Sequence, residues 1–242
     1  MRYLVISDIH ANLLALEAVL HDAKGDWDCI WCLGDIVGYG PDPNECVQLL
    51  LEHEHLSLSG NHDWAVLGKL EIESFNNEAR AAIRWTQDVL EEGVRHYLAE
   101  LPPLIVKEPF TLAHGSPRQP VWEYVQDEGS AAQNFALLTT PYCFVGHTHM
   151  PLIFAEADLG SSRISLPVYN EPLSLGTQRL IINPGSVGQP RDSDPRAAYG
   201  LLDSEAMTWE YRRVAYDVSQ TQDRMRGHGM PFRLVARLEM GW

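Results

Sequence analysis

The sequence contains no apolar run that approaches the roughly 20 residues needed to cross a bilayer. Residues 1–7 are too short for the apolar region of a secretory signal and lead directly into a polar motif. We therefore expect a cytoplasmic protein that does not reside in a membrane.

Basic residues are also scarce, with 18 Lys and Arg against 33 Asp and Glu and a formal net charge of −15. Long nucleic acids and anionic membrane surfaces are bound through basic patches, so both are unfavourable partners. An anionic ligand would need a local source of positive charge, which bound cations would supply.

Cysteine is limited to four residues, of which Cys29 and Cys32 have the C-x-x-C spacing typical of zinc or redox sites. They fall within residues 27–33, which read as a strand. Residues three apart on a strand point to opposite faces, so the two sulfurs do not converge. We expect reduced cysteines packed in a core rather than a metal or redox pair.

What the chain does contain is ordinary for a soluble globular protein: 242 residues, 45% hydrophobic and 21% charged. No internal repeat, low-complexity tract or convincing linker interrupts it. This length supports one large core, and we expect a single domain over residues 1–242.

The first 60 residues alternate between strand and helix patterns. Asn12 is placed to cap one helix, and Asp42 followed by Pro43 begins another that runs to about His53. Such alternation predicts parallel strands with helices on the sheet faces. The strands are expected at residues 2–7, 27–33 and 55–59.

Beyond this region, residues 64–101 are expected to be mainly helical, with Asn76 or Asn77 as a cap. After residue 149 the pattern favours a second, largely antiparallel sheet. Residues 157–178 show no steady periodicity and suit a mobile loop, an extended hairpin near the site, or a plain surface loop. The remaining expected elements are strands at 109–113, 142–146, 151–156, 179–183, 198–203 and 207–214, and helices at 130–138, 218–226 and 232–240.

Five polar clusters stand where predicted strands end. Taken singly, such residues are usually turn residues or caps. Taken together at successive strand ends, they are expected to meet on one rim of one sheet, where ligands of α/β sheets bind. Two Asp, one Asn and several His suit two divalent cations, and such a site suits phosphate-ester hydrolysis. The clusters are residues 8–10, 34–35, 60–63, 113–115 and 146–149.

The order D-x-H, G-D, G-N-H-D, H and G-H-T-H resembles the calcineurin-like metallophosphoesterase family. Residues 183–191 resemble a strand-end segment of its small bacterial and archaeal branch, which holds phosphodiesterases and phosphatases of broad specificity. The resemblance implies an α/β fold, a four-layer αββα sandwich of two mixed sheets flanked by helices. It also implies two divalent cations, with Mn favoured and Fe, Zn, Ni, Co or Mg open, and a small phosphate ester as substrate, with nucleotides included.

The resemblance further implies a role for each motif residue. The first metal would be held by Asp8, His10 and His149, and the second by Asn61, His114 and His147, with Asp35 bridging both. Two dications less the two carboxylates leave the centre at about +2, which would attract a phosphate despite the acidic composition.

Four further residues are candidates for supporting roles. In the family, His62 lies across the phosphate, where it stabilises charge and protonates the leaving oxygen. Asp63 would accept a hydrogen bond from His62, the alternative being a turn or cap. Arg191 would contact the substrate phosphate or else form an exposed salt bridge. Gly38 occupies the position at which the related purple acid phosphatases carry a ligating Tyr, and Tyr39 is the next residue.

Two function classes therefore follow. The first is a metal-dependent phosphoesterase that uses an activated hydroxide. The second is a catalytically weak metal- or nucleotide-binding or scaffold protein on the same fold, because a fold alone does not establish catalysis. Substrate choice is expected to reside in residues 64–100, 116–128 and 157–178. Oligomeric state has no signature in the sequence.

Overall fold

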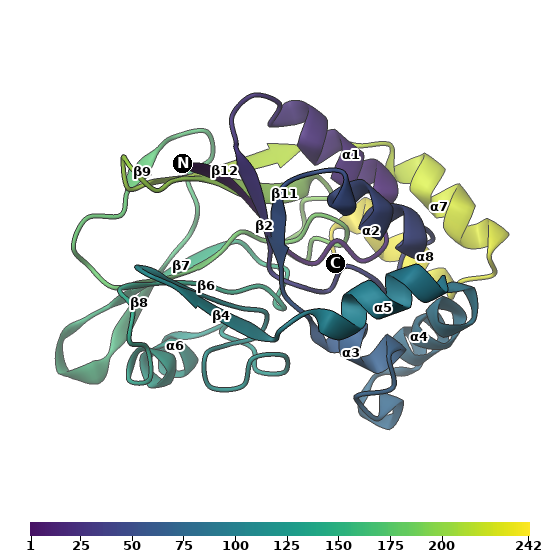
Figure 1. The fold of residues 1–242 in the computed structure, drawn as a ribbon, viewed down its shortest axis with the longest axis horizontal. Coiled ribbons are helices and arrows are strands. Elements are labelled where there is room, and N and C mark those ends of the chain that lie inside the picture. The colour runs from purple at the N-terminus through teal and green to yellow at the C-terminus, as the bar shows by residue number, and fades with distance from the viewer.

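The structure is a computed structural model that describes residues 1–242, the side chain of residue 159 excepted. Two six-stranded mixed sheets pack face to face, with helices on their outer faces (Figure 1). This confirms the expected fold class. The first sheet has the order β3 (His55–Ser57), β2 (Cys29–Cys32), β1 (Arg2–Ile6), β11 (Ala197–Asp203), β12 (Thr208–Val214) and β9 (Leu173–Ser174).

The second sheet has the order β4 (Leu104–Lys107), β5 (Phe110–Ala113), β6 (Tyr142–Phe144), β10 (Leu180–Asn183), β7 (Leu152–Glu156) and β8 (Ser162–Ser165). Its central strand β6 pairs in parallel with both β5 and β10. The outer strands β4, β7 and β8 run antiparallel to their neighbours.

The strands are therefore divided between the sheets differently from the expectation. β11 and β12 were expected in the later antiparallel sheet, but β11 joins the first sheet by pairing antiparallel with β1, Val5 opposite Gly200. β5 and β6 belong to the second sheet instead of continuing the first. Periodicity identifies a strand, but its partner is chosen by burial against residues far away in the sequence.

Three hydrophobic cores separate the four layers. Val5, Trp31 and Trp209 lie between the two sheets, together with Phe110 and Phe144. A second core joins the other face of the first sheet to the helices of the large helical layer. A third joins the outer face of the second sheet to α6 (Glu128–Phe135). Every sheet face is thus covered, which explains why most strands read as continuous apolar runs.

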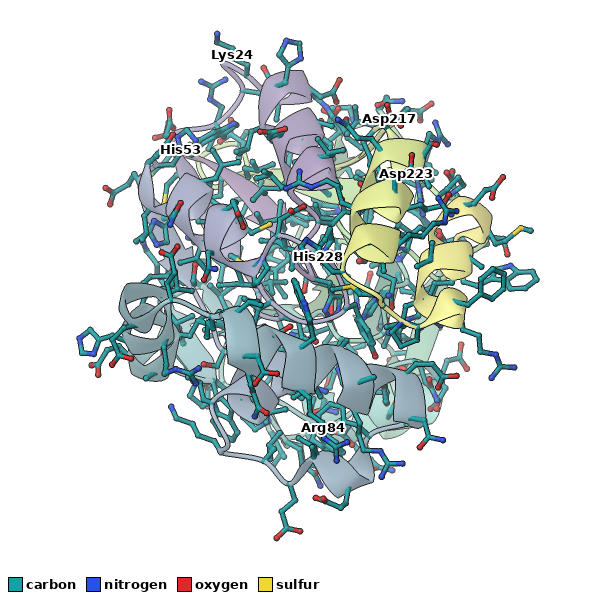
Figure 2. The ribbon with its side chains drawn as sticks, turned by 90° about the vertical axis from the view of Figure 1, so that its right-hand side faces the viewer. Lys24, His53, Arg84, Asp217, Asp223 and His228 are labelled. Carbon is teal, nitrogen blue, oxygen red and sulfur yellow. The ribbon has the colours of Figure 1, made fainter. Side chains whose placement is uncertain are left out.

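The large helical layer is seen face-on in Figure 2, where Asp217, Asp223 and His228 mark α7 and Arg84 marks α4. Asn12 caps the first helix by accepting from Ala15 N, as expected, and Asn76 caps α4 by accepting from Ala79 N. The layer consists of α1 (Leu13–Asp22), α2 (Pro43–Leu51), α3 (Asn61–Val66), α4 (Asn77–Val89), α5 (Glu92–Glu100), α7 (Val218–Gly227) and α8 (Phe232–Met240).

Asp42 departs from its expected role. It occupies the N-cap position of α2, but its side chain makes no capping hydrogen bond and instead pairs with Arg224 of α7. The side chain therefore ties α2 to α7 rather than closing its own helix. The helix also ends at Leu51, two residues before the expected end.

The cysteine prediction is confirmed. Cys29 packs in the core between the sheets, whereas Cys32 on the same strand packs against the helices. All four cysteines are buried and free. Burial raises the pKa of Cys32 to about 12, so its sulfur stays protonated near neutral pH.

Residues 157–178 run along the open edges of both sheets. They contain β8, a short 3₁₀ turn at Asp158–Gly160, and β9, and Tyr169 forms a bridge with Tyr211. β7 and β8 form an antiparallel hairpin. Among the helices that the structure describes, none is long and apolar enough to cross a membrane.

Candidate metal centre

The seven expected ligands and His62 come together in one buried cluster. Asp8 and His10 follow β1, Asp35 follows β2, and Asn61 begins α3 just after β3. The remaining histidines follow β5 and β6 of the second sheet. The expectation of one rim on one sheet is therefore wrong, because the cluster lies where the carboxyl ends of two facing sheets meet. Those second-sheet histidines are His114, His147 and His149.

The backbone at this junction is strained. Ten non-glycine residues in the described chain have positive φ, and seven of these belong to the cluster or adjoin it. Each such residue costs about 1 kcal/mol or more and persists only where its surroundings hold it. The tight turns that contain these residues direct side chains into the cluster shortly after the strands end. These residues are Asp8, His10, Ala11, Asp35, Tyr39, His147 and His149.

The first group of donors surrounds Asp8. His149 Nε2 lies 3.3 Å from Asp8 Oδ1 and 3.2 Å from His10 Nε2. His10 Nε2 is in turn 3.6 Å from Asp35 Oδ2. Two imidazole nitrogens and two carboxylate oxygens thus converge on a space that a divalent cation would fill.

The second group surrounds His114. Its Nε2 lies 3.2 Å from both Asn61 Oδ1 and His147 Nδ1, and 3.4 Å from Asp35 Oδ2. Asp35 Oδ2 therefore faces both groups. One carboxylate shared between two sets of ligands is the arrangement that a pair of cations requires.

The carboxylates provide a test of whether cations fit. Asp8 Oδ2 accepts from His147 N, and Asp35 Oδ1 accepts from His62 N. Asp8 Oδ1 and Asp35 Oδ2 are buried and have no hydrogen-bond partner among the described residues. Buried unpartnered carboxylate oxygens are costly unless a cation meets them, so the donor set fits two divalent cations.

The imidazole rings of the four histidines among the expected ligands share one arrangement. One ring nitrogen of each hydrogen-bonds a backbone carbonyl, and the other faces the centre. A carbonyl accepts only from N–H, so it fixes the tautomer and leaves the inward nitrogen free to donate its lone pair. The pairs are His10 Nδ1 with Val37 O, His114 Nδ1 with Leu33 O, His147 Nε2 with Trp122 O, and His149 Nδ1 with Gln189 O.

Burial and the charges of neighbouring groups shift the pKa values of the expected ligands in different directions. Burial raises the pKa of Asp8 to about 6 and lowers that of His147 to about 3. Burial also opposes ionisation of Asp35, but the facing imidazoles, His114 first, hold its pKa well below the usual range. Its carboxylate in turn overcomes the burial of His114 and raises that pKa to about 9. Without cations, His114 therefore carries the proton that balances Asp35.

His62 lies beside the donors in an aromatic setting. Its ring centroid is 4.3 Å from that of Tyr39, 4.9 Å from that of His10 and 5.2 Å from that of Phe75. Its Nδ1 is buried with no hydrogen-bond partner among the described residues. His62 also offers a ligand atom within 4.8 Å of those of His10 and Asp35, so its position alone gives it access to a cation.

Asp63 does not take the role expected for it. Its Oδ2 accepts from Gly60 N at 2.8 Å and its Oδ1 from Val37 N at 3.1 Å. No hydrogen bond from His62 reaches it among the described contacts. Asp63 is thus a helix cap that also holds the loop after β2, which is the alternative weighed from the sequence.

A pocket of about 290 Å³ opens over the donors, and Arg191 lines it, in a position to contact a phosphate. The exposed salt bridge considered for Arg191 is absent from the described contacts. None of the lining residues of this pocket falls within 157–178, so of the alternatives for that segment a hairpin near the site is not supported. The sequence indicated segments 64–100 and 116–128 as near the substrate and singled out Tyr39, which lines the pocket, but not the other pocket residues, which follow no motif. They are Ser74, Phe75, Asn76, Ala79, Trp122 and Tyr124.

Comparison with known proteins identifies relatives over the whole chain. The model of the calcineurin-like phosphoesterase superfamily domain matches residues 1–207. A metallophosphoesterase of Sphaerobacter thermophilus is similar in structure, with a TM-score of 0.92, 48% identity, and coverage of 100% of this chain and 99% of that one.

Two archaeal proteins are also similar. An uncharacterized protein of Methanocaldococcus jannaschii is 39% identical, covering 98% of this chain and 97% of its own. A hypothetical protein of Pyrococcus horikoshii shares the fold, with a TM-score of 0.80 at 20% identity and coverage of 100% and 98%. From the family match, these relatives and the buried Asp and His donors, we conclude that the chain belongs to the calcineurin-like phosphoesterase superfamily.

Proposed function

We propose that the protein hydrolyses small phosphodiesters or phosphomonoesters at a centre of two divalent cations, with Mn²⁺ as the favoured metal. The observation that carries this proposal is the pair of donor groups that share Asp35 Oδ2. Asp8, His10 and His149 would hold one cation, and Asn61, His114 and His147 the other. When bound, two such cations lower the pKa of a water molecule toward neutrality and offset the charge of a phosphate.

The reaction consumes one water molecule. Its oxygen forms a new bond to phosphorus while the ester oxygen departs and takes up a proton. The pocket restricts where the ester can lie, because some of the donors line it together with Arg191, Tyr39 and Trp122. The donors among its lining residues are Asp35, Asn61, His147 and His149. Arg191 would bind a phosphate oxygen that the cations do not engage.

His62 would supply the proton that the leaving ester oxygen takes up. Burial lowers its pKa to about 4, so the ring is neutral near neutral pH in the free protein. A bound phosphate brings negative charge to the ring and raises that pKa, so that His62 gains a proton and can deliver it to the leaving oxygen. The His62 ring lines the pocket, which brings it into reach of a bound ester, while its Nδ1 is buried with no hydrogen-bond partner among the described residues.

The first test is turnover of 4-nitrophenyl phosphate and bis(4-nitrophenyl) phosphate with Mn²⁺, Ni²⁺, Co²⁺ or Zn²⁺. We expect hydrolysis of at least one ester, abolished by a chelator and restored by metal. His62→Ala should retain both cations but lower kcat by about 10²- to 10⁴-fold. His96→Ala, an exposed histidine on α5, serves as the matched control and should match the parent protein.

Two results would contradict the proposal. Absence of turnover on both esters with all four metals would favour a protein that binds without catalysis. Loss of metal in His62→Ala, measured by elemental analysis of the purified variant, would make His62 a ligand instead of a proton donor.

A further inference from the structure

A second polar site lies beside the catalytic pocket, around the side chain of Gln189. This residue is 1% exposed, and its Oε1 accepts from Arg191 Nη2 at 3.0 Å and from Arg237 Nη1 at 3.4 Å. The two guanidinium groups are thus held on the same oxygen. Arg191 comes from the segment after β10, and Arg237 comes from α8.

The charge of this arginine pair is not matched by an Asp or Glu side chain. Among the described contacts neither arginine forms an ion pair with a side-chain carboxylate, whereas nine other arginines do. Arg237 Nε donates to the main-chain oxygen of Trp242 at 2.6 Å, whereas Arg191 has no acidic partner, and the nearby Glu78 is engaged by Arg233 at 3.6 Å. A guanidinium without an acidic partner, beside a second guanidinium, is unusual in a chain of net charge −15 and indicates that an anion belongs there.

Unused donors point to the same conclusion. Arg191 Nε and Gln189 Nε2 are both buried and have no hydrogen-bond partner among the described residues. Burial and the neighbouring Arg191 lower the pKa of Arg237, which reflects how closely the two positive groups are held. A ligand that accepts hydrogen bonds and carries negative charge would satisfy these donors and relieve the repulsion.

The arginine pair lies beside the catalytic pocket. Arg191 lines that pocket, Arg237 lines an adjoining pocket of about 410 Å³, and Asn76 lines both. The arginines therefore stand where the two pockets meet. The main chain of Gln189 accepts from His149 Nδ1 at 2.6 Å, so the same residue that bridges the arginines also orients an expected metal ligand.

We infer that Arg191, Gln189 and Arg237 form a subsite for a second phosphate group of the substrate, next to the phosphate that is hydrolysed. The inference rests on the proposed function and narrows its substrate class to small molecules with two neighbouring phosphates. Arg191 reaches both phosphates, whereas Arg237 contacts only the second. The adjoining pocket gives the rest of such a molecule room to continue.

The test compares two inhibitors of 4-nitrophenyl phosphate hydrolysis, methylphosphonate with one phosphonate group and methylenediphosphonate with two. The metal is kept in excess so that chelation does not empty the site. The parent protein should bind methylenediphosphonate at least about tenfold more tightly. Arg237→Gln should reduce this preference about 10- to 100-fold, the loss expected for charge-assisted hydrogen bonds.

Two further variants separate charge from structure. Arg237→Lys keeps the charge and should retain an intermediate preference, even if the loss of the Arg237 Nε bond to Trp242 O loosens the end of α8. Arg226→Gln removes an exposed arginine of α7 that pairs with Asp223 and lines neither pocket, and it should keep the full preference. The inference is overturned if the parent protein shows no preference, or if Arg237→Gln and Arg237→Lys both retain it.

A direct binding measurement distinguishes this inference from the proposed function. Both phosphonates are titrated calorimetrically into the metal-loaded protein, with no ester present. Preferential binding of methylenediphosphonate that depends on Arg237 supports the subsite even where no ester is hydrolysed. Hydrolysis of the ester with equal binding of both phosphonates would support the proposed function and reject the subsite.

Discussion

Gly38 lies against His62 so closely that no side chain fits between them. A Cβ built on Gly38 would stand 2.6 Å from His62 Nδ1, and its φ of +90° is one that other residues adopt at a cost. Gly38→Ala should therefore displace the His62 ring and lower kcat severalfold or more while both cations remain bound. Metal content and kcat with Mn²⁺ are the measurements.

Gly25→Ala is the matched control for this substitution. Gly25 also has a φ of +90°, but nothing lies within 4 Å of its added Cβ. Both variants should lose about 1–2 kcal/mol of unfolding free energy from backbone strain. Only Gly38→Ala should lose activity, and equal kcat in the two variants would show that the position of the His62 ring does not matter.

His114 links metal binding to pH. In the metal-free protein its pKa is about 9, because the Asp35 carboxylate outweighs the effect of burial. A ligating imidazole must be neutral, so binding should release about one proton at about pH 7.5. Affinity should rise with pH until about 9, and fall more steeply below about 6 as Asp8 also gains a proton. Calorimetry in buffers of different ionisation enthalpy counts the protons, and none released would contradict this assignment.

At the scale of elements, α4 shows how a helix end shapes the pocket. Asn76 accepts from Ala79 N and also lines both pockets. Asn76→Ala should cost about 1 kcal/mol of unfolding free energy and raise KM, because the helix end frays at the pocket wall. Asp127→Ala removes the equivalent cap of α6 and should cost similar stability with KM unchanged. Chemical denaturation and steady-state kinetics measure both effects.

The elements also show what the sequence can and cannot predict. The clustering of the expected ligands was predictable because each lies within five residues of the end of a strand, so its place depends mainly on local pattern. The pairing of β11 with β1 was not predictable, since it depends on burial between residues almost 200 apart. Asp63 and Asp42 illustrate the same limit at helix ends. The sequence indicates that each is a polar residue at a turn. Its hydrogen-bond or ion-pair partner, however, depends on which distant residues the fold brings close to it.

Across the whole molecule, the expected metal ligands come from both sheets. Asp8, His10, Asp35 and Asn61 lie near strand ends of the first sheet, and the other three expected ligands near strand ends of the second. The core between the sheets, with Trp31 and Trp209 fully buried, holds them together without metal. Bound cations would add a second connection between the sheets, because an unfolded chain does not present both donor groups at once.

Metal should therefore raise the melting temperature, and Asp35 should account for most of the effect. A cation at a hundred times its Kd contributes about 2.7 kcal/mol, which corresponds to roughly 5–10 °C for a chain of this length. Asp35→Asn removes the charge shared by both groups and should reduce the shift by more than half. Asp223→Asn, on the exposed face of α7, should retain the full shift. Calorimetric melting with and without Mn²⁺ measures it, and an undiminished shift in Asp35→Asn would mean that the cations are held elsewhere.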